Sequence, residues 1–253
     1  MKYNVLNEFK EYLTETLAPS TALTYYKAVD YLLKEQVLID LRKMNIDIVI
    51  AKLKAMRYKN QYSKYKNAFL KLCDYINLNF DEKTMMELEG MSFEKRKKRR
   101  DLTPIKLEDI KNRIRVIRDK KLKLSYQTML ITGLRVSELV QITKENGIIE
   151  DGSLTLHFIG KGGKREFVKL TDKKLLIGLQ GLIANASANE HLFYSANYLQ
   201  SEALKRGFKC VDLRRAFAML SYKEHRNIKK VMKLMRHSKY ENTKIYLNNR
   251  VKF

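Results

Sequence analysis

The first 80 residues repeat apolar positions at helical spacing. One such face is formed by positions that recur at steps of three or four residues, namely Leu6, Phe9, Leu13 and Leu17. Pro19 and Ser20 interrupt this pattern, and Ser20 is predicted to cap the helix that follows. Further helical periodicity runs through residues 23–32, 44–56 and 62–78. This part of the chain is therefore predicted to form a small bundle of about four helices.

The period of the pattern changes between residues 147 and 170. Apolar positions at 154, 156 and 158 alternate with their neighbours, and Asp151-Gly152 supplies a turn before them. The segment 160–163, Gly-Lys-Gly-Gly, supplies a second turn before the alternating run 165–170. We expect a small antiparallel sheet of two or three strands here, followed from about residue 173 by helices. The fold class is thus mainly α with a small antiparallel β-sheet.

These patterns divide the chain into three parts: a helical domain at 1–82, a connector at 83–102 and an α+β domain at 103–253. Thr103-Pro104 is predicted to start the first helix of the second domain, as a capping hydroxyl followed by a proline. The connector ends in six consecutive basic residues, 95–100. Such a run is compatible with a nuclear-import signal, a solvated linker or a segment that follows a phosphate backbone, and composition favours the solvated linker.

The charge narrows the class of partner. The chain carries a formal net charge of +23, and residues 103–253 contribute 31 basic against 14 acidic side chains, or +17 of that total. An excess of this size favours a polyanion such as nucleic acid over the alternative of a merely solubilising basic surface. No strongly basic amphipathic helix points to a membrane surface. With no signal-peptide core and only two cysteines, the sequence predicts a reduced, cytoplasmic protein.

Four short segments of the second domain carry the candidate chemistry. They are Thr132-Gly-Leu-Arg-Val-Ser-Glu-Leu139, the turn at 160–165, Val211-Asp-Leu-Arg-Arg-Ala216, and Leu234-Met-Arg-His-Ser238 with the following Asn242–Leu247. The spacing is 23 residues from Arg214 to His237 and 9 residues from His237 to Tyr246. In this order and spacing, the segments together resemble the tyrosine recombinase family of phage integrases and Xer-like recombinases.

The resemblance extends over the whole chain. Residues 1–82 look like the family's core-binding domain, and residues 103–253 look like its catalytic domain. It implies a site-specific recombinase that clamps double-stranded DNA between two domains, assembles as a tetramer on paired sites, and needs neither a metal nor a nucleotide cofactor. It also implies association with the nucleoid or with viral and mobile-element DNA. The sequence leaves open whether the protein is an integrase or a dimer resolvase.

The resemblance also assigns roles, and the chemistry explains the residue types. Tyr246 is the nucleophile of a covalent 3′-phosphotyrosine intermediate. Arg135 and Arg214 match the two guanidiniums whose planar forks hold the phosphate oxygens. Lys161 on the hairpin turn matches the proton donor to the leaving 5′-oxygen, with Lys164 as a second choice. His237 matches a residue that hydrogen-bonds the phosphate or assists proton transfer at the tyrosine.

Two features depart from the family pattern. The position three residues before Arg214 usually holds His or Lys, and here it is Val211, which cannot exchange a proton. Three explanations are open: the role of this side chain is dispensable here, a neighbour such as Lys209 or Arg215 takes it over, or the enzyme is impaired. Only seven residues follow Tyr246 in this sequence, so docking of a long C-terminal helix on a neighbouring protomer is not expected. These departures motivate the alternative of a catalytically degraded DNA-binding or architectural protein that keeps the DNA clamp.

Overall fold

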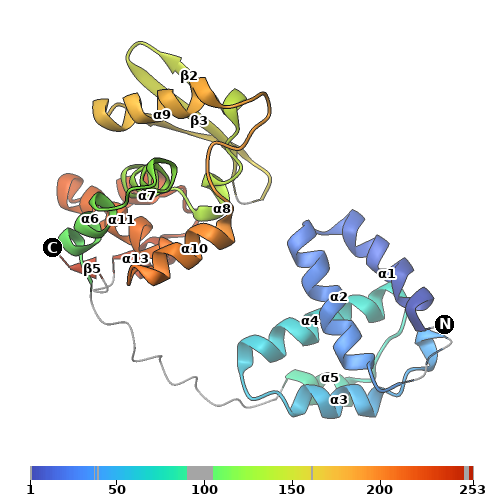
Figure 1. The fold of residues 1–253 in the computed structure, drawn as a ribbon. Helices are drawn as coiled ribbons and strands as arrows, with labels where there is room; N and C mark the ends of the chain where they lie inside the picture. Colours follow the sequence, from blue (N-terminus) through green and yellow to red (C-terminus); the bar gives the residue numbers. More distant parts are fainter. Residues whose placement is uncertain are drawn as a thin grey trace. The chain divides into compact units, whose positions relative to one another are not determined.

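A computed structural model describes residues 2–36, 38, 40–89, 105–160, 162–247 and 251–252. The chain divides into two compact units, Met1–Arg99 and Arg100–Phe253 (Figure 1). The predicted class, mainly α with a small antiparallel sheet, is confirmed. The basic run at 95–100, the predicted helix start at Thr103-Pro104 and the candidate Lys161 lie outside the described residues.

The first unit consists of helices. They are α1 (Lys2–Thr16), α2 (Pro19–Leu33), a 3₁₀ turn (Leu41–Lys43), α3 (Ile46–Lys54), α4 (Lys59–Tyr75) and α5 (Glu82–Glu89). Helix α2 packs against α1, α3 and α4. It begins at Pro19 with Ala18 as its N-cap, so the prediction of a Ser20 cap was wrong. Proline suits the first helical position because its missing N–H would have no partner there.

The core of the first unit is apolar. Phe9, Leu32, Phe69 and Leu72 are fully buried in it, in agreement with the helical periodicity of the sequence. Leu88 of α5 belongs to the same core. The first residues of the predicted connector 83–102 therefore form a helix of this unit.

The second unit combines helices with short strands. Its elements are β1 (Ile105–Lys106), α6 (Leu107–Arg115), α7 (Lys120–Thr132), α8 (Val136–Leu139), a 3₁₀ turn (Lys144–Asn146), β2 (Gly147–Glu150), β3 (Ser153–Ile159), β4 (Arg165–Leu170), α9 (Lys173–Asn185), α10 (Ala196–Lys205), α11 (Cys210–His225), α12 (Ile228–Leu234), α13 (Tyr240–Tyr246) and β5 (Val251–Lys252). The helix predicted to start at Thr103-Pro104 begins instead at Leu107. The reason is that Ile105–Lys106 is extended and pairs in parallel with Val251–Lys252.

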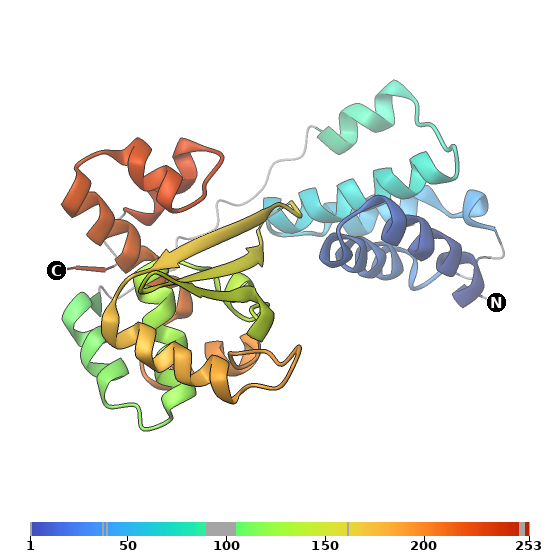
Figure 2. The ribbon, with the colours of Figure 1, turned by 90° about the horizontal axis from the view of Figure 1, so that it is seen from above.

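The predicted sheet has three antiparallel strands in the order β2-β3-β4, which lie side by side in Figure 2. Asp151 and Gly152 both adopt positive φ, 47° and 68°, between the paired residues Glu150 and Ser153. Positive φ at both central residues is the geometry of a tight type I′ hairpin, so the predicted turn is confirmed. Along β3, Leu154, Leu156 and Phe158 are buried while His157 is exposed, as the alternation indicated.

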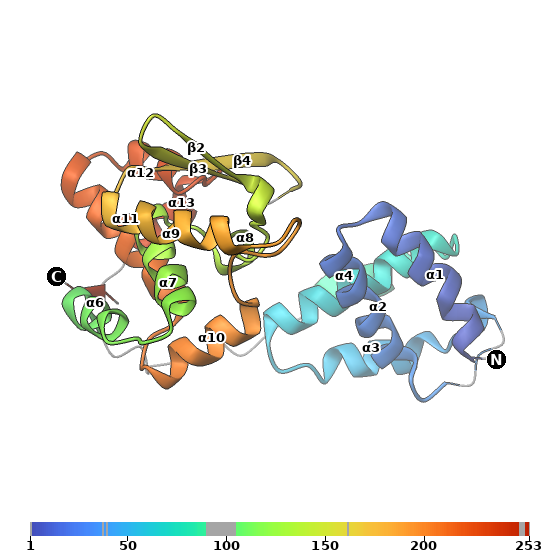
Figure 3. The ribbon, with the colours of Figure 1, turned by 45° about the horizontal axis from the view of Figure 1, so that its top comes forward.

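Helix α7 organises the second unit. It packs against α9 and β4 on one side and against α11 on the other (Figures 1 and 3). Tyr126 of α7 is fully buried, and its hydroxyl donates to the carbonyl of Leu199 at 2.7 Å. Helices α11, α12 and α13 pack on one another, and α8 contacts β3. Arg214 of α11 contacts the carbonyl of Gly133 at the end of α7 and the ring of Tyr246 on α13, so these three helices meet at this arginine.

Candidate active site

A glycine turn sets the position of Arg135. Helix α7 ends at Gly133, whose φ is 65°, and a Cβ on this residue would lie 2.3 Å from a ring atom of Phe217. Only glycine fits here, because a side chain would meet both the ring and an unfavourable backbone conformation. The chain then turns into α8 with Arg135 as its N-cap. The Arg135 amide donates to Glu138 Oε2 at 2.8 Å, and its guanidinium donates to Glu138 Oε1.

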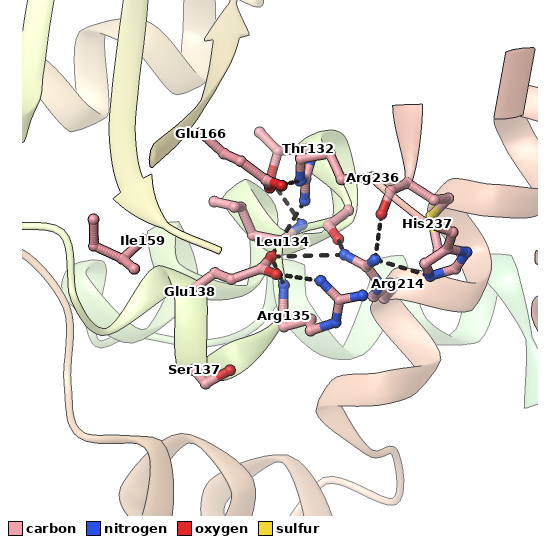
Figure 4. A network of polar contacts seen from close by, with 12 residues as sticks. Thr132, Leu134, Arg135, Ser137, Glu138, Ile159, Glu166, Arg214, Arg236 and His237 are labelled. Atoms are coloured by element: carbon pink, nitrogen blue, oxygen red, sulfur yellow. Dashed lines mark hydrogen bonds and ion pairs between the residues drawn. The ribbon is translucent and has the colours of Figure 1, made fainter. Parts of the chain in front are cut away.

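Arg214 is a buried cation on α11, with only 1% of its surface exposed. Its Nη1 donates to the Gly133 carbonyl, and its Nη2 donates to the Met235 carbonyl at 2.5 Å. Glu138 Oε2 lies 3.7 Å from Nη1, so one carboxylate faces both arginines (Figure 4). Burial, followed by repulsion from Arg135, lowers the pKa of Arg214 to about 10. The guanidinium thus stays protonated at neutral pH and is held rigidly.

His237 joins Arg214 to helix α13. Its Nε2 lies 3.1 Å from Nη2 of Arg214, and its Nδ1 lies 3.0 Å from the Thr243 hydroxyl. A guanidinium can only donate, so Nε2 is the acceptor and the ring proton resides on Nδ1. Burial, with a further contribution from Arg214, lowers the pKa of His237 to about 4. The imidazole is therefore neutral at physiological pH.

Tyr246 is the last residue of α13 and is half-buried. Its ring centroid lies 5.2 Å from that of His237 and 5.6 Å from the guanidinium carbon of Arg214. The ring also packs against a small apolar cluster of Ala218, Val231 and Met235. The structure therefore brings four of the five predicted site residues together, namely Arg135, Arg214, His237 and Tyr246, while Lys161 lies outside the described residues.

A pocket of about 430 Å³ opens at this cluster. Its lining includes Arg135, Arg214 and Tyr246, and also Lys209 and Val211. Arg215, the other residue that could replace the family's His or Lys, does not line this pocket. Its Nη1 is bound instead to Asp212 Oδ1 at 2.9 Å. Of the two neighbours considered for the role left vacant at position 211, Lys209 is the one beside the pocket.

Arg236 and Glu166 also belong to the cluster, and the sequence analysis missed both. Nη2 of Arg236 lies 3.3 Å from Glu138 Oε2, and its Nε lies 3.2 Å from Glu166 Oε2 on β4. Burial lowers the pKa of Arg236, and Glu138 opposes that shift. The sequence carries only weak signs of a role for Arg236 and Glu166, because an arginine beside a histidine and a glutamate in an alternating strand are both common at protein surfaces.

Other candidate groups are inert or structural. Burial raises the pKa of the Cys73 thiol to about 12 and that of the Cys210 thiol to about 11, so neither forms a thiolate at neutral pH. Asp212 accepts a hydrogen bond from the backbone N–H of Lys209 at 2.9 Å and so caps α11.

In the part of the chain that the structure describes, no group of three or more His, Cys, Asp or Glu side chains could hold a metal ion. Nor does that part contain a helix long and apolar enough to cross a membrane.

Comparison with solved structures reveals the same fold in several recombinases. A lambda integrase tetramer bound to a Holliday junction has a TM-score of 0.68 at 14% identity, covering 98% of this chain and 77% of that one. The XerH site-specific recombinase bound to palindromic difH substrate has a TM-score of 0.59 at 19% identity, covering 89% and 73%. The Tn1549 transposon integrase bound to a circular intermediate DNA has a TM-score of 0.57 at 14% identity, covering 96% and 94%.

Sequence comparison gives the family. No significant match is found among curated proteins. The model of the phage integrase family matches residues 100–252. This range contains Tyr246, His237 and the cluster of arginines and glutamates at positions 135, 138, 166, 214 and 236. Because this match extends over most of the chain and the fold agrees with it, the chain belongs to the phage integrase family of tyrosine recombinases.

Proposed function

We propose that this protein is a site-specific DNA recombinase that cleaves and rejoins strands through a covalent 3′-phosphotyrosine intermediate, without a metal or nucleotide cofactor. The observation that carries the proposal is the pocket that Arg135 and Arg214 share with Tyr246. The Nε of Arg214 is buried and has no hydrogen-bond partner among the described residues. A buried N–H without an acceptor is costly, and a phosphate oxygen entering the pocket supplies that acceptor.

The charge of the cluster fits a phosphodiester. Three buried or half-buried arginines, at 135, 214 and 236, face the carboxylates of Glu138 and Glu166. Their formal charges leave one unit of positive charge. A phosphodiester carries one negative charge and balances it, and the fixed guanidiniums stabilise the additional charge of the transition state. The cluster is thus suited to a single phosphate rather than to a polyphosphate.

The chemical step is a transesterification. The Tyr246 hydroxyl attacks the phosphorus, the bond from phosphorus to the 5′-oxygen breaks, and a 3′-phosphotyrosine forms. Lys161 donates a proton to the leaving 5′-oxygen. The phenol proton passes to Nε2 of the neutral His237. The incoming phosphate accepts from Nη2 of Arg214 in place of this ring nitrogen, and its negative charge raises the proton affinity of the imidazole. The reverse reaction with another 5′-hydroxyl rejoins the strand and returns both protons.

The partner in this proposal is double-stranded DNA, bound by a tetramer on paired sites. The similar lambda integrase and XerH structures are DNA complexes. The net charge of +17 on residues 103–253 supports binding to phosphates around the reacting one. Contacts of this kind give an affinity that falls steeply with salt and carries little sequence information.

A suicide substrate tests the proposal. The wild-type protein first selects its site from a randomised duplex library, and the selected site is then nicked a few nucleotides from the cleaved phosphate so that the released fragment diffuses away. We expect the wild type to accumulate a protein–DNA adduct at equal rates with and without a metal chelator. Tyr246→Phe forms no adduct, whereas Tyr240→Phe, at the exposed start of the same helix, forms it normally.

Val211 provides the specific ground for a second candidate function, a DNA-binding protein that has lost turnover. This residue lines the pocket and is 36% exposed, but it can neither donate nor accept a proton. The same experiment separates the two functions. A wild-type protein that binds its selected site with strong salt dependence, yet never forms the adduct, would establish the binding function and exclude the recombinase.

A further inference from the structure

Arg236 lies between the β3–β4 hairpin and the arginine pair formed by Arg135 and Arg214. Its guanidinium contacts Glu166 of β4 on one side and Glu138 of α8 on the other (Figure 4). Glu138 in turn binds Arg135 and lies 3.7 Å from Arg214. Since Glu138 and Glu166 both contact Arg236, this guanidinium is the bridge that connects the hairpin to the phosphate-binding arginines.

The contact with the hairpin involves both of its strands. Phe158 on β3 and Glu166 on β4 are cross-strand partners, and the guanidinium carbon of Arg236 lies 5.3 Å from the centroid of the Phe158 ring. The guanidinium thus combines an ion pair with one strand and a cation–π contact with the other. A side chain that holds both strands fixes the direction in which the hairpin points.

The turn of the hairpin follows immediately. Gly160 packs closely against the Glu166 carboxylate, since a Cβ at this glycine would lie 2.7 Å from the carboxyl carbon. The Gly160 amide donates to the Lys164 carbonyl at 2.7 Å and closes the turn. The carboxylate that Arg236 binds is therefore the one against which the beginning of the turn rests.

The backbone at Arg236 adopts a conformation that ordinarily favours glycine. Its φ is 54°, in the left-handed region where glycine fits without strain and other residues do not. Arg226, at the end of α11, has a similar φ of 49° but an exposed side chain. The two arginines share a backbone conformation, and only Arg236 places its guanidinium in the buried cluster.

The geometry points to Arg236 as a positioning residue that holds β3, β4 and the start of the hairpin turn at Gly160 in place beside Arg135 and Arg214. This inference rests on the recombinase function proposed above, in which Lys161 of that turn protonates the leaving 5′-oxygen. Arg236 acts through Glu166 and Glu138 and does not itself contact the reacting atoms. Its loss should therefore impair protonation of the leaving group more than attack by the tyrosine.

A change of leaving group tests this role. In a substrate whose bridging 5′-oxygen is replaced by sulfur, the leaving thiolate is a much weaker base and departs without a proton donor. Arg236→Gly removes the guanidinium while relieving the backbone. We expect it to slow adduct formation roughly 100-fold on the oxygen substrate, the size of effect that a misplacement of about 1 Å produces. On the sulfur substrate the variant should cleave within a few-fold of the wild-type rate.

The matched control is Arg226→Gly, the same exchange at the same backbone conformation outside the cluster, which should cleave both substrates at the wild-type rate under saturating protein. The inference is overturned if Arg236→Gly cleaves the oxygen substrate normally, because no positioning is then lost. It is equally overturned if the variant is slowed to the same extent on both substrates, because Arg236 then serves the arginine pair or the fold. A wild-type protein that forms no adduct on either substrate refutes the proposed function itself, and so the two failures are distinct.

Discussion

The interiors of the two units differ in kind. Among the described residues of the first unit, the single buried polar side chain is Gln36, which exchanges hydrogen bonds with the Asn45 backbone at 2.7 and 3.2 Å. In the second unit the buried polar groups include the charged or titratable Glu138, Asp212, Arg214 and His237. Transfer of an ionised group out of water is unfavourable unless it is paired. The second unit therefore retains an interior that stability alone does not require.

This difference separates the roles of the two units. Apolar packing of the kind found in the first unit holds helices together without directing any particular chemistry. The buried cluster of the second unit instead fixes the direction of each guanidinium before DNA arrives. Electrostatic catalysis depends on such fixed dipoles and charges, since they need not reorganise during the reaction. If the charged interior behaves as one coupled unit, the loss of one of its charges should affect the others.

The largest effect is expected for Glu138→Gln. Glu138 faces three arginines, and removal of its charge leaves their mutual repulsion uncompensated in a buried site. Breaking a buried ion pair in this way destabilises a protein by about 3–5 kcal/mol. Hydrogen exchange of amides in the second unit, measured at increasing denaturant concentration, gives the free energy of unfolding of this unit and hence the loss.

The matched control for Glu138→Gln lies in the first unit. Glu87 pairs with Lys54 at the surface, with about half of each side chain exposed. Glu87→Gln should cost less than about 1 kcal/mol, because solvent screens such a pair. Equal losses for the two exchanges would show that the cluster in the second unit is no more than a set of ordinary surface ion pairs.

The Glu138 cluster also marks how far sequence reasoning reached. The motif segments identified Arg135, Arg214, His237 and Tyr246, because their spacing along the chain is characteristic even when each segment alone is common. The alternating pattern likewise predicted an antiparallel sheet of two or three strands, of which the structure has three, since side-chain direction in a strand follows directly from position. These predictions depended on local order in the sequence.

Long-range pairing was beyond that reach. Arg236 meets Glu166 and Glu138 across 70 and 98 positions of sequence, and no local pattern encodes such a contact. The helix predicted from Thr103 does not include Ile105–Lys106 for the same reason, because these two residues are extended and pair with Val251–Lys252. Local signals were outweighed in each case by a partner distant in the chain.

A smaller effect is expected from pH. The pKa of His237 is lowered to about 4 in the folded protein, from an ordinary value near 6.5. As the pH falls, His237 therefore takes up a proton at a higher pH in the unfolded chain than in the folded protein. The stability that neutral His237 contributes is complete above pH 6.5, decreases as the pH falls below that value, and is lost at about pH 4, a change of at most about 3 kcal/mol.

The two units give the pH experiment its control. All four histidines lie in the second unit, at positions 157, 191, 225 and 237, so the first unit has none to titrate in this window. Hydrogen exchange at pH 7 and pH 5 should show protection falling in the second unit while that of the first unit changes little. His237→Gln, which cannot be protonated, should abolish the difference. A pH response that survives this exchange would contradict the assignment to His237.

The smallest effect is expected at the edge of the pocket. Lys209 lines it together with Val211, and its exposed ammonium adds positive charge beside Arg135 and Arg214. At this exposure the interaction with a bound phosphate is partly screened, so Lys209→Ala should slow adduct formation only about tenfold. The helix cap survives this exchange, because it is the backbone N–H of Lys209 that Asp212 accepts. Arg215→Gln should leave the rate in the DNA-saturated complex unchanged, since Arg215 is bound to Asp212.

A second exchange decides whether Lys209 replaces the side chain missing at position 211. Val211→His places a proton-bearing group in the same pocket. If Lys209 performs this role, Val211→His should change the wild-type rate little but restore most of the rate lost in Lys209→Ala. If Val211→His instead accelerates both backgrounds by the same factor, the two positions act independently and the role at 211 is vacant in the native protein. Independent effects multiply whereas a shared role does not, so the double variant separates substitution from loss.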